Sequence, residues 1–209
     1  LPHHPVVLLD VGANTDCRPP FLMDFAVMGS IYAREIFNRR SPKVGLLNIG
    51  SEEGKGNELA QSTYKLLSES NLNFIGNVEG GDLFSGRVDV VVCDGFVGNV
   101  VLKFAEGMFS FLTSYIKAEL IKNPITKFGA LTIRPAMRKI RSQMDSAEMG
   151  GAPLLGVNGI CLVGHGASDA TAIKNAIRMA GECVRRDLNG KIQIALNEEN
   201  GKKNKSESV

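Results

Sequence analysis

Apolar residues follow two patterns along the chain, and each predicts one kind of element. Four short runs are mainly apolar, which is typical of buried strands: Val6–Leu9, Val44–Ile49, Asn73–Gly76 and Val88–Cys93. Three longer stretches are predicted as helices: 21–37, 57–68 and one from about residue 99 that ends before Pro124. Strands that alternate with helices favour parallel pairing through right-handed crossovers, and apolar strands suit a sheet covered on both faces.

The second half of the chain departs from this alternation. A further helix is predicted over about 134–147 with Pro135 in its first turn, so residues 104–147 form a helical excursion. Two short strands, Leu154–Val157 and Ile160–Val163, precede a final helix over about 168–188. The polar residues 189–209 are expected to be disordered. The predicted fold class is α/β, with a mostly parallel sheet in one domain over 1–188.

Glycines and small polar residues follow four of the predicted strands. The segments are DVGAN (10–14), GSEEGKGNE (50–58), CDGFVGN (93–99) and GHGASD (164–169). Parallel strands place their carboxyl ends at one edge of a sheet, where ligands bind in open α/β folds. Free N–H groups at helix starts favour an anion there. The pattern therefore predicts one cleft that accepts phosphate or carboxylate.

Composition narrows the class of protein. The chain has 209 residues, 44% hydrophobic content and a net charge of +2, which gives no argument for nucleic-acid binding. It has no secretory signal pattern and no run of 18 apolar residues, so we expect a cytoplasmic protein that does not span a membrane. It begins at Leu1 without an initiator methionine, so we expect the C-terminal part of a longer protein. Four widely spaced cysteines suit neither a zinc site nor a disulfide framework: Cys17, Cys93, Cys161 and Cys183.

The same loops, in this order, carry a family resemblance over nearly the whole chain except its tail. The matching segments are DVGAN (10–14), MGSIYA (28–33), VGLLNIGSEEGKGNE (44–58), NFIGNVEG (73–80), VDVVVCDGFVGNVVLK (88–103), GGAPLLGV (150–157) and GHGASD (164–169). They resemble the bacterial phosphate acyltransferases of phospholipid synthesis. That resemblance implies a three-layer α/β/α sandwich similar to phosphotransacetylases and isopropylmalate dehydrogenases. It also implies that a fatty acyl group passes from acyl carrier protein to inorganic phosphate, without a cofactor. Members form homodimers and associate peripherally with the cytoplasmic membrane face. They begin with a further segment that this chain lacks, so the chain looks like their C-terminal two-thirds.

Phosphate attack on a thioester depends on positioning and electrostatics, because thiolate leaves readily. Lys55 lies between Gly54 and Gly56 and beside Asn57, so it can neutralise phosphate while loop N–H groups donate to it. The plain alternative is a solvated loop lysine. This loop lacks the order of residues found in a P-loop.

Two further strand ends supply polar groups with two interpretations each. Asn99, after Gly95 and Gly98, either caps the long helix or donates to an anion or oxyanion. Asp94 either orders this turn or positions Lys55 by charge. Asn14, with Asp16, either forms an Asx turn or binds substrate.

The last glycine loop carries His165 between Gly164 and Gly166. We expect it to protonate the leaving thiolate or to bind phosphate, with a structural histidine as the alternative. Ser168 either caps the final helix or donates to phosphate. No nucleophile elbow of the GxSxG type and no convincing metal-ligand spacing is found.

The helical excursion intersperses apolar and basic residues. Five of them are partner or membrane candidates: Lys127, Phe128, Arg134, Arg138 and Arg141. One interpretation is a helical hairpin buried between two subunits. The other is an apolar tip that touches the bilayer, with basic residues near anionic lipid or acidic carrier protein, and both can hold. The alternatives for the whole chain are a related phosphotransacetylase-like or dehydrogenase-like enzyme, or a non-catalytic lobe that dimerises or binds membrane.

Overall fold

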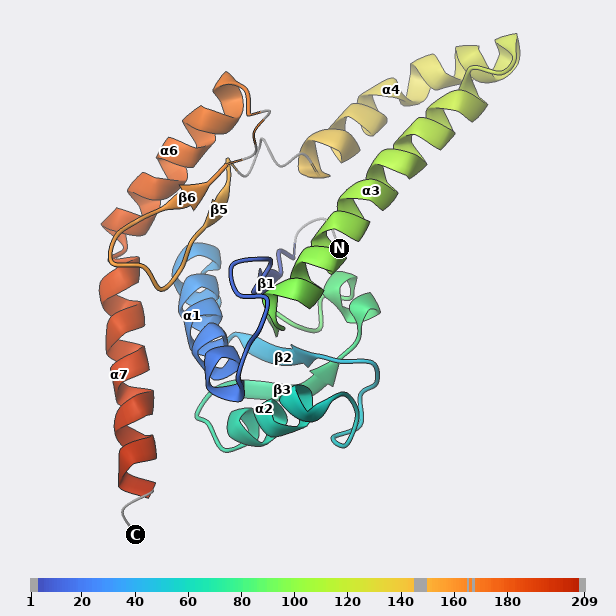
Figure 1. Ribbon diagram of the computed structural model, residues 1–209. Helices are drawn as coiled ribbons and strands as arrows, with labels where there is room; N and C mark the ends of the chain where they lie inside the picture. The colour runs from blue at the N-terminus through green and yellow to red at the C-terminus, as the bar shows by residue number, and fades with distance from the viewer. Residues whose placement is uncertain (1–3, 145–149, 165, 167, 207–209) are drawn as a thin grey trace. The chain divides into compact units, whose positions relative to one another are not determined.

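The computed structural model describes residues 4–144, 150–164, 166 and 168–206 (Figure 1). The chain groups into two compact units. Unit 1 comprises Leu1–Val100, Leu154–Cys161 and Ala180–Val209, and unit 2 comprises Val101–Pro153 and Leu162–Met179.

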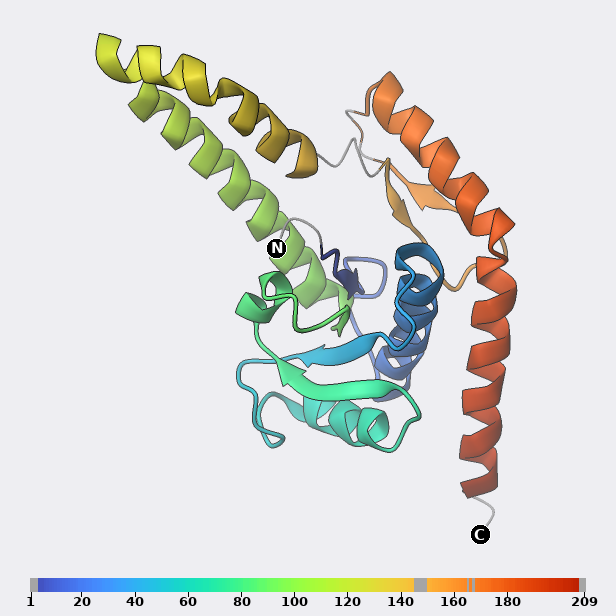
Figure 2. The same cartoon turned by 180° about the vertical axis from the view of Figure 1, so that it is seen from behind.

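Unit 1 is built on a parallel four-stranded sheet, which confirms the predicted fold class. Its strands are β1 (Val7–Leu9), β2 (Lys43–Leu47), β3 (Asn73–Val78) and β4 (Val90–Val92), in the spatial order β1-β4-β2-β3. The central strand β4 pairs with β1 on one side and β2 on the other, so that Val90 lies opposite both Val7 and Val44. Figure 2 shows β2 and β3 side by side, as their pairing requires.

Both faces of this sheet are covered, as its apolar strands predicted. Helix α1 (Pro19–Phe37) approaches one face so closely that a Cβ atom on Gly29 would lie 2.6 Å from Cγ1 of Val90. On the other face Val91 packs with Val78 and Val88. Leu83 of the 3-10 helix η1 (Gly80–Phe84) also packs there. Helix α2 (Glu58–Ser68) packs against α1 and β3.

The polar tail is helical where disorder was expected. Helix α7 runs from Leu188 to Ser206, and Leu188 and Ile192 are only 1% and 4% exposed. These two residues are four apart and therefore share one helix face, which packs against α1. Disorder was expected because most residues of this segment are polar, and the two apolar positions were given too little weight.

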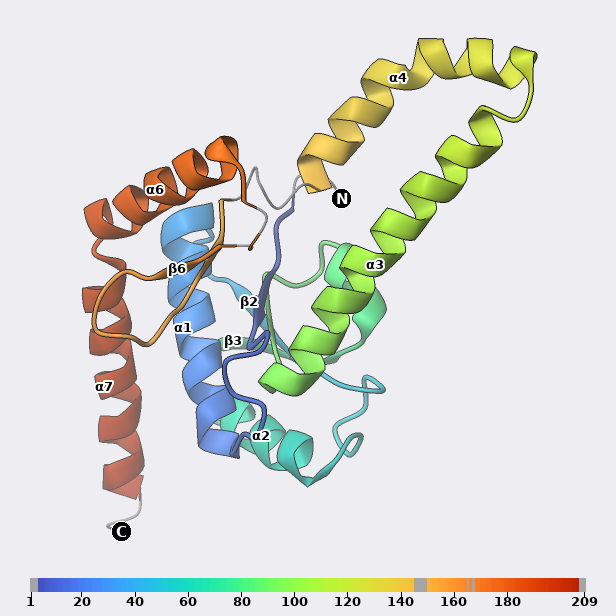
Figure 3. The same cartoon turned by 45° about the horizontal axis from the view of Figure 1, so that its top comes forward.

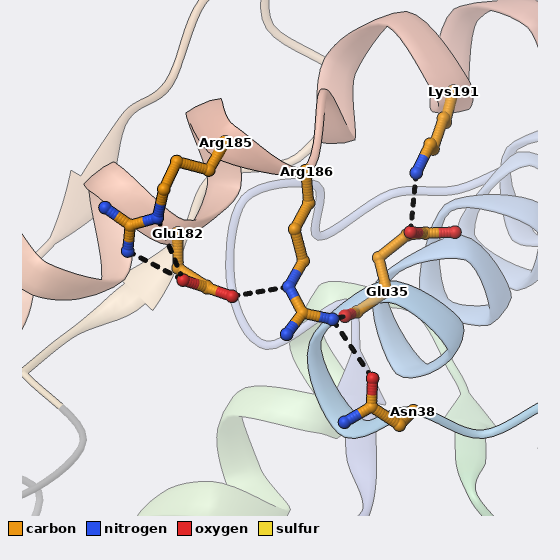
Figure 4. A network of polar contacts seen from close by, with 6 residues as sticks. All are labelled: Glu35, Asn38, Glu182, Arg185, Arg186 and Lys191. Carbon is orange, nitrogen blue, oxygen red and sulfur yellow. Dashed lines mark hydrogen bonds and ion pairs between the residues drawn. The ribbon is translucent and has the colours of Figure 1, made fainter.

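A polar network joins the end of α1 to the junction of α6 (Ala170–Arg185) and α7 (Figure 4). Arg186 donates to the Glu182 carboxylate, to the backbone carbonyl of Glu35 and to the side chain of Asn38. Asn38 ends α1 in the left-handed conformation. Lys191 of α7 pairs with the Glu35 carboxylate at 2.6 Å. The network therefore satisfies the last turn of α1 and anchors the first turn of α7.

Unit 2 contains most of helix α3 (Gly95–Leu120), helix α4 (Pro124–Met144), part of α6 and a small antiparallel pair. Figure 3 shows α4 turning back at the end of α3. Helix α4 begins at Pro124, well before the predicted start near Arg134, and Pro135 lies inside it. The Asn123 side chain accepts from the Thr126 N–H at 2.9 Å, so Asn123 caps the helix and Pro124 occupies its first position.

The two late strands are shorter than predicted; the first ends before its predicted start at Leu154, and the second lies within the predicted Ile160–Val163. They are β5 (Ala152–Pro153) and β6 (Leu162–Val163). Gly156 and Gly159, at φ values of 81° and 151°, turn the chain between them, which removes most of the predicted strand residues. The predicted final helix corresponds to α6, which ends at Arg185, and Asp187 at φ 50° separates it from α7.

Among the described residues, one helix is long and apolar enough to cross a membrane. This is helix α3, and only 11% of its most apolar window is buried within the protein. Lys103 and Glu106 form an ion pair at 2.9 Å within this helix.

Candidate functional site

The carboxyl ends of β1, β2 and β4 carry the candidate site, which lies within unit 1. An open pocket of about 380 Å³ is formed by the loop after β1, the start of α2 and the start of α3. Its lining residues are Thr15, Asp16, Cys17, Asn57, Leu59, Asp94, Phe96 and Val97. The sequence predicted that the glycine loops after four strands lie together at one edge of the sheet, and three of these loops do so.

The loop after β1 folds around the side chain of Asp10. One carboxylate oxygen accepts the N–H groups of Gly12 and Ala13 at 2.8 and 2.9 Å. The other accepts the backbone N–H and side-chain Nδ2 of Asn14 at 2.7 and 2.9 Å. Asn14 therefore donates to a turn that the Asp10 carboxylate organises, which differs from the Asx turn that the sequence suggested for Asn14.

Two glycines let this loop touch the beginning of α3. A Cβ atom on Gly98 would lie 1.8 Å from the carbonyl oxygen of Asp10, and one on Gly95 would lie 2.6 Å from that of Asn14. The Gly95 N–H donates to the same Asn14 oxygen at 2.8 Å. Both glycines are thus required for backbone-to-backbone contact.

The capping residue of α3 is Asp94, and the expectation that Asn99 caps it is wrong. The helix begins at Gly95, and the Asp94 carboxylate accepts the Val97 N–H at 2.8 Å. Asn99 lies one turn further on, beside the loop after β1. A Cβ atom on Gly12 would be 3.7 Å from its Cγ. The helix starts earlier because Asp94 satisfies an N–H group that would otherwise lack a partner.

Side-chain amides hold the loop between β2 and α2. Asn48 Nδ2 donates to the carbonyl of Lys55, and Asn77 Nδ2 donates to that of Glu52, at 3.0 and 2.7 Å. Gln61 donates to the carbonyls of Gly54 and Gly56 at 2.9 and 3.2 Å. Four carbonyl groups are therefore directed toward amide donors of the domain.

This loop leads directly into α2. Asn57 caps the helix, as predicted, and accepts the Ala60 N–H at 2.9 Å. Gly56 has a φ of +89°, which favours glycine. Lys55 is half exposed and pairs with Glu52 at 3.9 Å. The charged partner of Lys55 is therefore Glu52, whereas the sequence suggested Asp94. Lys55 is not among the residues that line the pocket.

The thiols near the site are poor nucleophiles. Burial, with some repulsion from Asp94 and Asp10, raises the pKa of Cys93 to about 12. Burial likewise raises the pKa of Cys17, which lines the pocket, and the N–H of Gly95 opposes this effect only in part. Neither thiol is ionised at neutral pH, so neither favours a covalent acyl-enzyme.

The remaining predicted residues belong to unit 2. Ser168 lies just before α6, and Asp169 caps this helix by accepting the Ala172 N–H at 2.8 Å. His165 lies outside the described residues. On α4 the side chains of Lys127, Phe128, Arg134 and Arg138 are exposed, and Arg141 lies within the helix although its side chain is outside the described part.

The sequence analysis did not identify the residues whose side chains hold the loops of the site by hydrogen bonds. Asp10, Asn48 and Asn77 each stand at or just beyond the carboxyl end of a strand, and that shared position was the available signal. Within the residues that the structure describes, no group of three or more His, Cys, Asp or Glu side chains is placed to hold a metal ion.

Comparison of the sequence with known proteins identifies its family. The model of the family described as fatty acid synthesis protein matches residues 1–191. A phosphate acyltransferase of Desulforudis audaxviator is 53% identical over 93% of this chain and 59% of its own length. Those of a Nostoc species and of Desulfitobacterium hafniense are 53% and 58% identical over 90% and 85% of the chain, and 56% and 54% of their own lengths. The chain thus spans just over half the length of these curated relatives. With its strand-end loops and its parallel sheet, the chain belongs to the fatty acid synthesis protein family, in which these phosphate acyltransferases are its relatives.

Proposed function

We propose that this chain supplies the phosphate and acyl-transfer site of a phosphate acyltransferase. The donor is a fatty acyl group on acyl carrier protein, and the acceptor is inorganic phosphate. The convergence of three strand-end loops on one pocket carries the proposal, together with relatives of that name at 53–58% identity. Because the chain spans little more than half of those relatives, we assign the complete activity to the longer protein.

The proposed reaction is a direct displacement. An oxygen of hydrogen phosphate attacks the thioester carbonyl, a C–O bond forms, and the C–S bond breaks. The proton of hydrogen phosphate ends on the departing thiolate, so the products are acyl phosphate and the free carrier thiol. The raised thiol pKa of Cys17 and Cys93 supports a route without an acyl-enzyme. His165 is the proposed relay for this proton, taking it from phosphate and passing it to the thiolate, and Ser168 is a proposed second donor to phosphate.

We place phosphate at the loop that precedes α2. A Cβ atom on Gly54 would meet no heavy atom within 4 Å, so the loop is open at that residue. Asn57 opens a helix whose N-terminus favours an anion. Lys55 supplies the positive charge. Its pair with Glu52 is long, at 3.9 Å, and half exposed, so exchange for phosphate costs little. Asp94 and Asp16 line the neighbouring pocket and would repel phosphate, which leaves that pocket for the neutral thioester.

Substitution of Lys55 tests this placement in the longer protein. Lys55→Ala is expected to raise the KM for phosphate by about tenfold or more, as loss of a charge-assisted contact requires. Lys55→Arg keeps the charge and should retain most of the affinity. Lys65→Ala, an exposed change on helix α2, which follows this loop, controls for net charge. An unchanged phosphate KM in Lys55→Ala would contradict the placement.

We also propose that the protein is a homodimer that contacts the membrane through its helical excursion. Large apolar side chains are exposed along α3 and α4, including Phe104, Phe111 and Phe128 at 67%, 61% and 73%. Such a surface is unusual unless a partner or lipid covers it. Basic residues Arg134 and Arg138, four apart on α4, suit anionic headgroups.

The two parts of that proposal separate by experiment. Phe128→Ser is expected to weaken cosedimentation with vesicles that contain anionic lipid and to leave the dimer mass unchanged. Phe104→Ser is expected to shift the mass toward the monomer. If neither variant changes either property, the exposed surface has another role.

A further inference from the structure

Asp10 has the surroundings of a bound anion. Its side chain is 6% exposed, and its two oxygens receive three successive backbone N–H groups, from Gly12, Ala13 and Asn14, at 2.7–2.9 Å. Consecutive N–H groups that converge on one acceptor form a concavity that proteins use to bind phosphate and other anions. In this loop the anion is the side chain of Asp10 itself, the residue that follows β1.

This internal anion is charged and firmly held. Burial raises the pKa of Asp10, but the hydrogen bonds from Ala13, Asn14 and Gly12 outweigh burial, so the pKa lies below its usual value. The side-chain amide of Asn14 adds a fourth hydrogen bond, at 2.9 Å. A free phosphate would have to displace a tethered carboxylate that loses no translational freedom by staying in place.

The filled concavity also fixes one side of the site. Asn14 closes the loop, and its carbonyl takes the N–H of Gly95, the first residue of α3. Gly12 lies beside the side chain of Asn99. The buried carboxylate of Asp10 therefore determines where α3 begins relative to β1.

We propose that Asp10 is a positioning residue of the acyl-transfer site, whose carboxylate occupies the anion-binding concavity of residues 10–14, keeps phosphate out of it and holds Asn14 against the start of α3. The role in transfer rests on the proposed function. The occupancy of the concavity by the Asp10 carboxylate is independent of the proposed function, because it can be measured without any activity.

Removal of the carboxylate should create a site for a small anion. In Asp10→Ala the three N–H groups lose their acceptor, so the thermal midpoint is expected to fall. Formate has the missing carboxylate group. At about ten times its dissociation constant it should raise the midpoint of Asp10→Ala by roughly 3–6 °C relative to the same concentration of chloride. The wild type should shift by less than about 1 °C.

Two matched variants sharpen this comparison. Asp10→Asn fills the same space with a neutral group, so it should lose stability without recovery in formate. Asp16→Ala removes an exposed carboxylate from the same loop and should lose little stability and gain nothing from formate. Equal responses of Asp10→Ala and the wild type to formate would overturn the proposal.

Amide resonances decide the question even if Asp10→Ala does not fold. Phosphate is titrated into the wild-type chain, and the amide shifts of Gly12, Ala13 and Asn14 are followed. Unchanged shifts support the proposal, and saturable shifts at these three residues overturn it. The amides of Gly56 and Asn57 test the proposed phosphate site in the same titration, so failure of one proposal is distinguishable from failure of the other.

Kinetics of the longer protein test the positioning role. Asp10→Asn should lower kcat by about tenfold or more while the KM for phosphate changes less than twofold, since the loop orients the site without binding phosphate. A raised phosphate KM with an unchanged kcat would contradict this role.

Discussion

Gly98 offers the sharpest test of how the site is assembled. A Cβ atom added there would lie 1.8 Å from the carbonyl oxygen of Asp10 and 3.0 Å from Sγ of Cys93. Carbon and oxygen atoms ordinarily approach no closer than about 3.3 Å. In Gly98→Ala the start of α3 and the end of β1 must therefore separate by about 1.5 Å.

The cost follows from what that separation breaks. The obstructing atom is backbone, so no side-chain rotation relieves the contact, and overpacking of this kind costs about 1–3 kcal/mol or more. The hydrogen bond from Gly95 to Asn14, at 2.8 Å, would be lost as well, at about 1 kcal/mol. We expect Gly98→Ala to lower the free energy of unfolding by about 2–4 kcal/mol.

Gly107 provides the control within the same helix. A Cβ atom at Gly107 would meet no heavy atom within 4 Å, so Gly107→Ala should stabilise the helix by about 0.5–1 kcal/mol. Urea unfolding of the wild type and both variants, followed by circular dichroism, measures the two differences with opposite expected signs. Equal or higher stability of Gly98→Ala than of the wild type would refute the proposed contact between β1 and α3.

Two further predictions follow from the ionisation of specific groups. Lys191 chiefly lowers the pKa of Glu35 through a hydrogen bond, so Glu35→Gln should cost about 0.5–1 kcal/mol at pH 7, a modest figure because Lys191 is 40% exposed. The carboxylate stabilises only while ionised, so in urea unfolding this difference should be present above pH 5 and shrink as pH falls below about 4; a difference that grows on acidification would contradict it. Iodoacetamide at pH 8 should label exposed Cys161 at least tenfold faster than Cys93, whose pKa is raised to about 12, as mass spectrometry can show, and similar rates would contradict the burial of Cys93.

The strands and the first helices could be predicted because their signals are local. Apolar runs gave the four parallel strands, and Asn57 was identified as a cap from its position before a helical stretch. The start of α3 was placed too late because Gly95 and Gly98 resemble loop residues. Their actual role is close contact with Asp10 and Asn14, which are far away in the sequence, and no local pattern reveals such a contact.

The support of the site was harder to predict for the same reason. Asp10 and Asn77 act through hydrogen bonds to backbone groups of loops, and any polar residue at a strand end has this possibility. Helix α7 was missed because two apolar residues, Leu188 and Ile192, decide its packing within a polar segment. Candidate chemistry at Lys55 was suggested by residue type, whereas its partner Glu52 depends on the folded loop.

Formation of acyl phosphate tests the central claim most directly. Long-chain acyl carrier protein is mixed with inorganic phosphate and either this chain or a version extended to the full length of its relatives, and acyl phosphate is trapped with hydroxylamine. The account predicts product from the extended protein in proportion to phosphate, with no acyl group retained on the denatured protein. Absence of product from both proteins, each shown to be folded, would contradict the assignment.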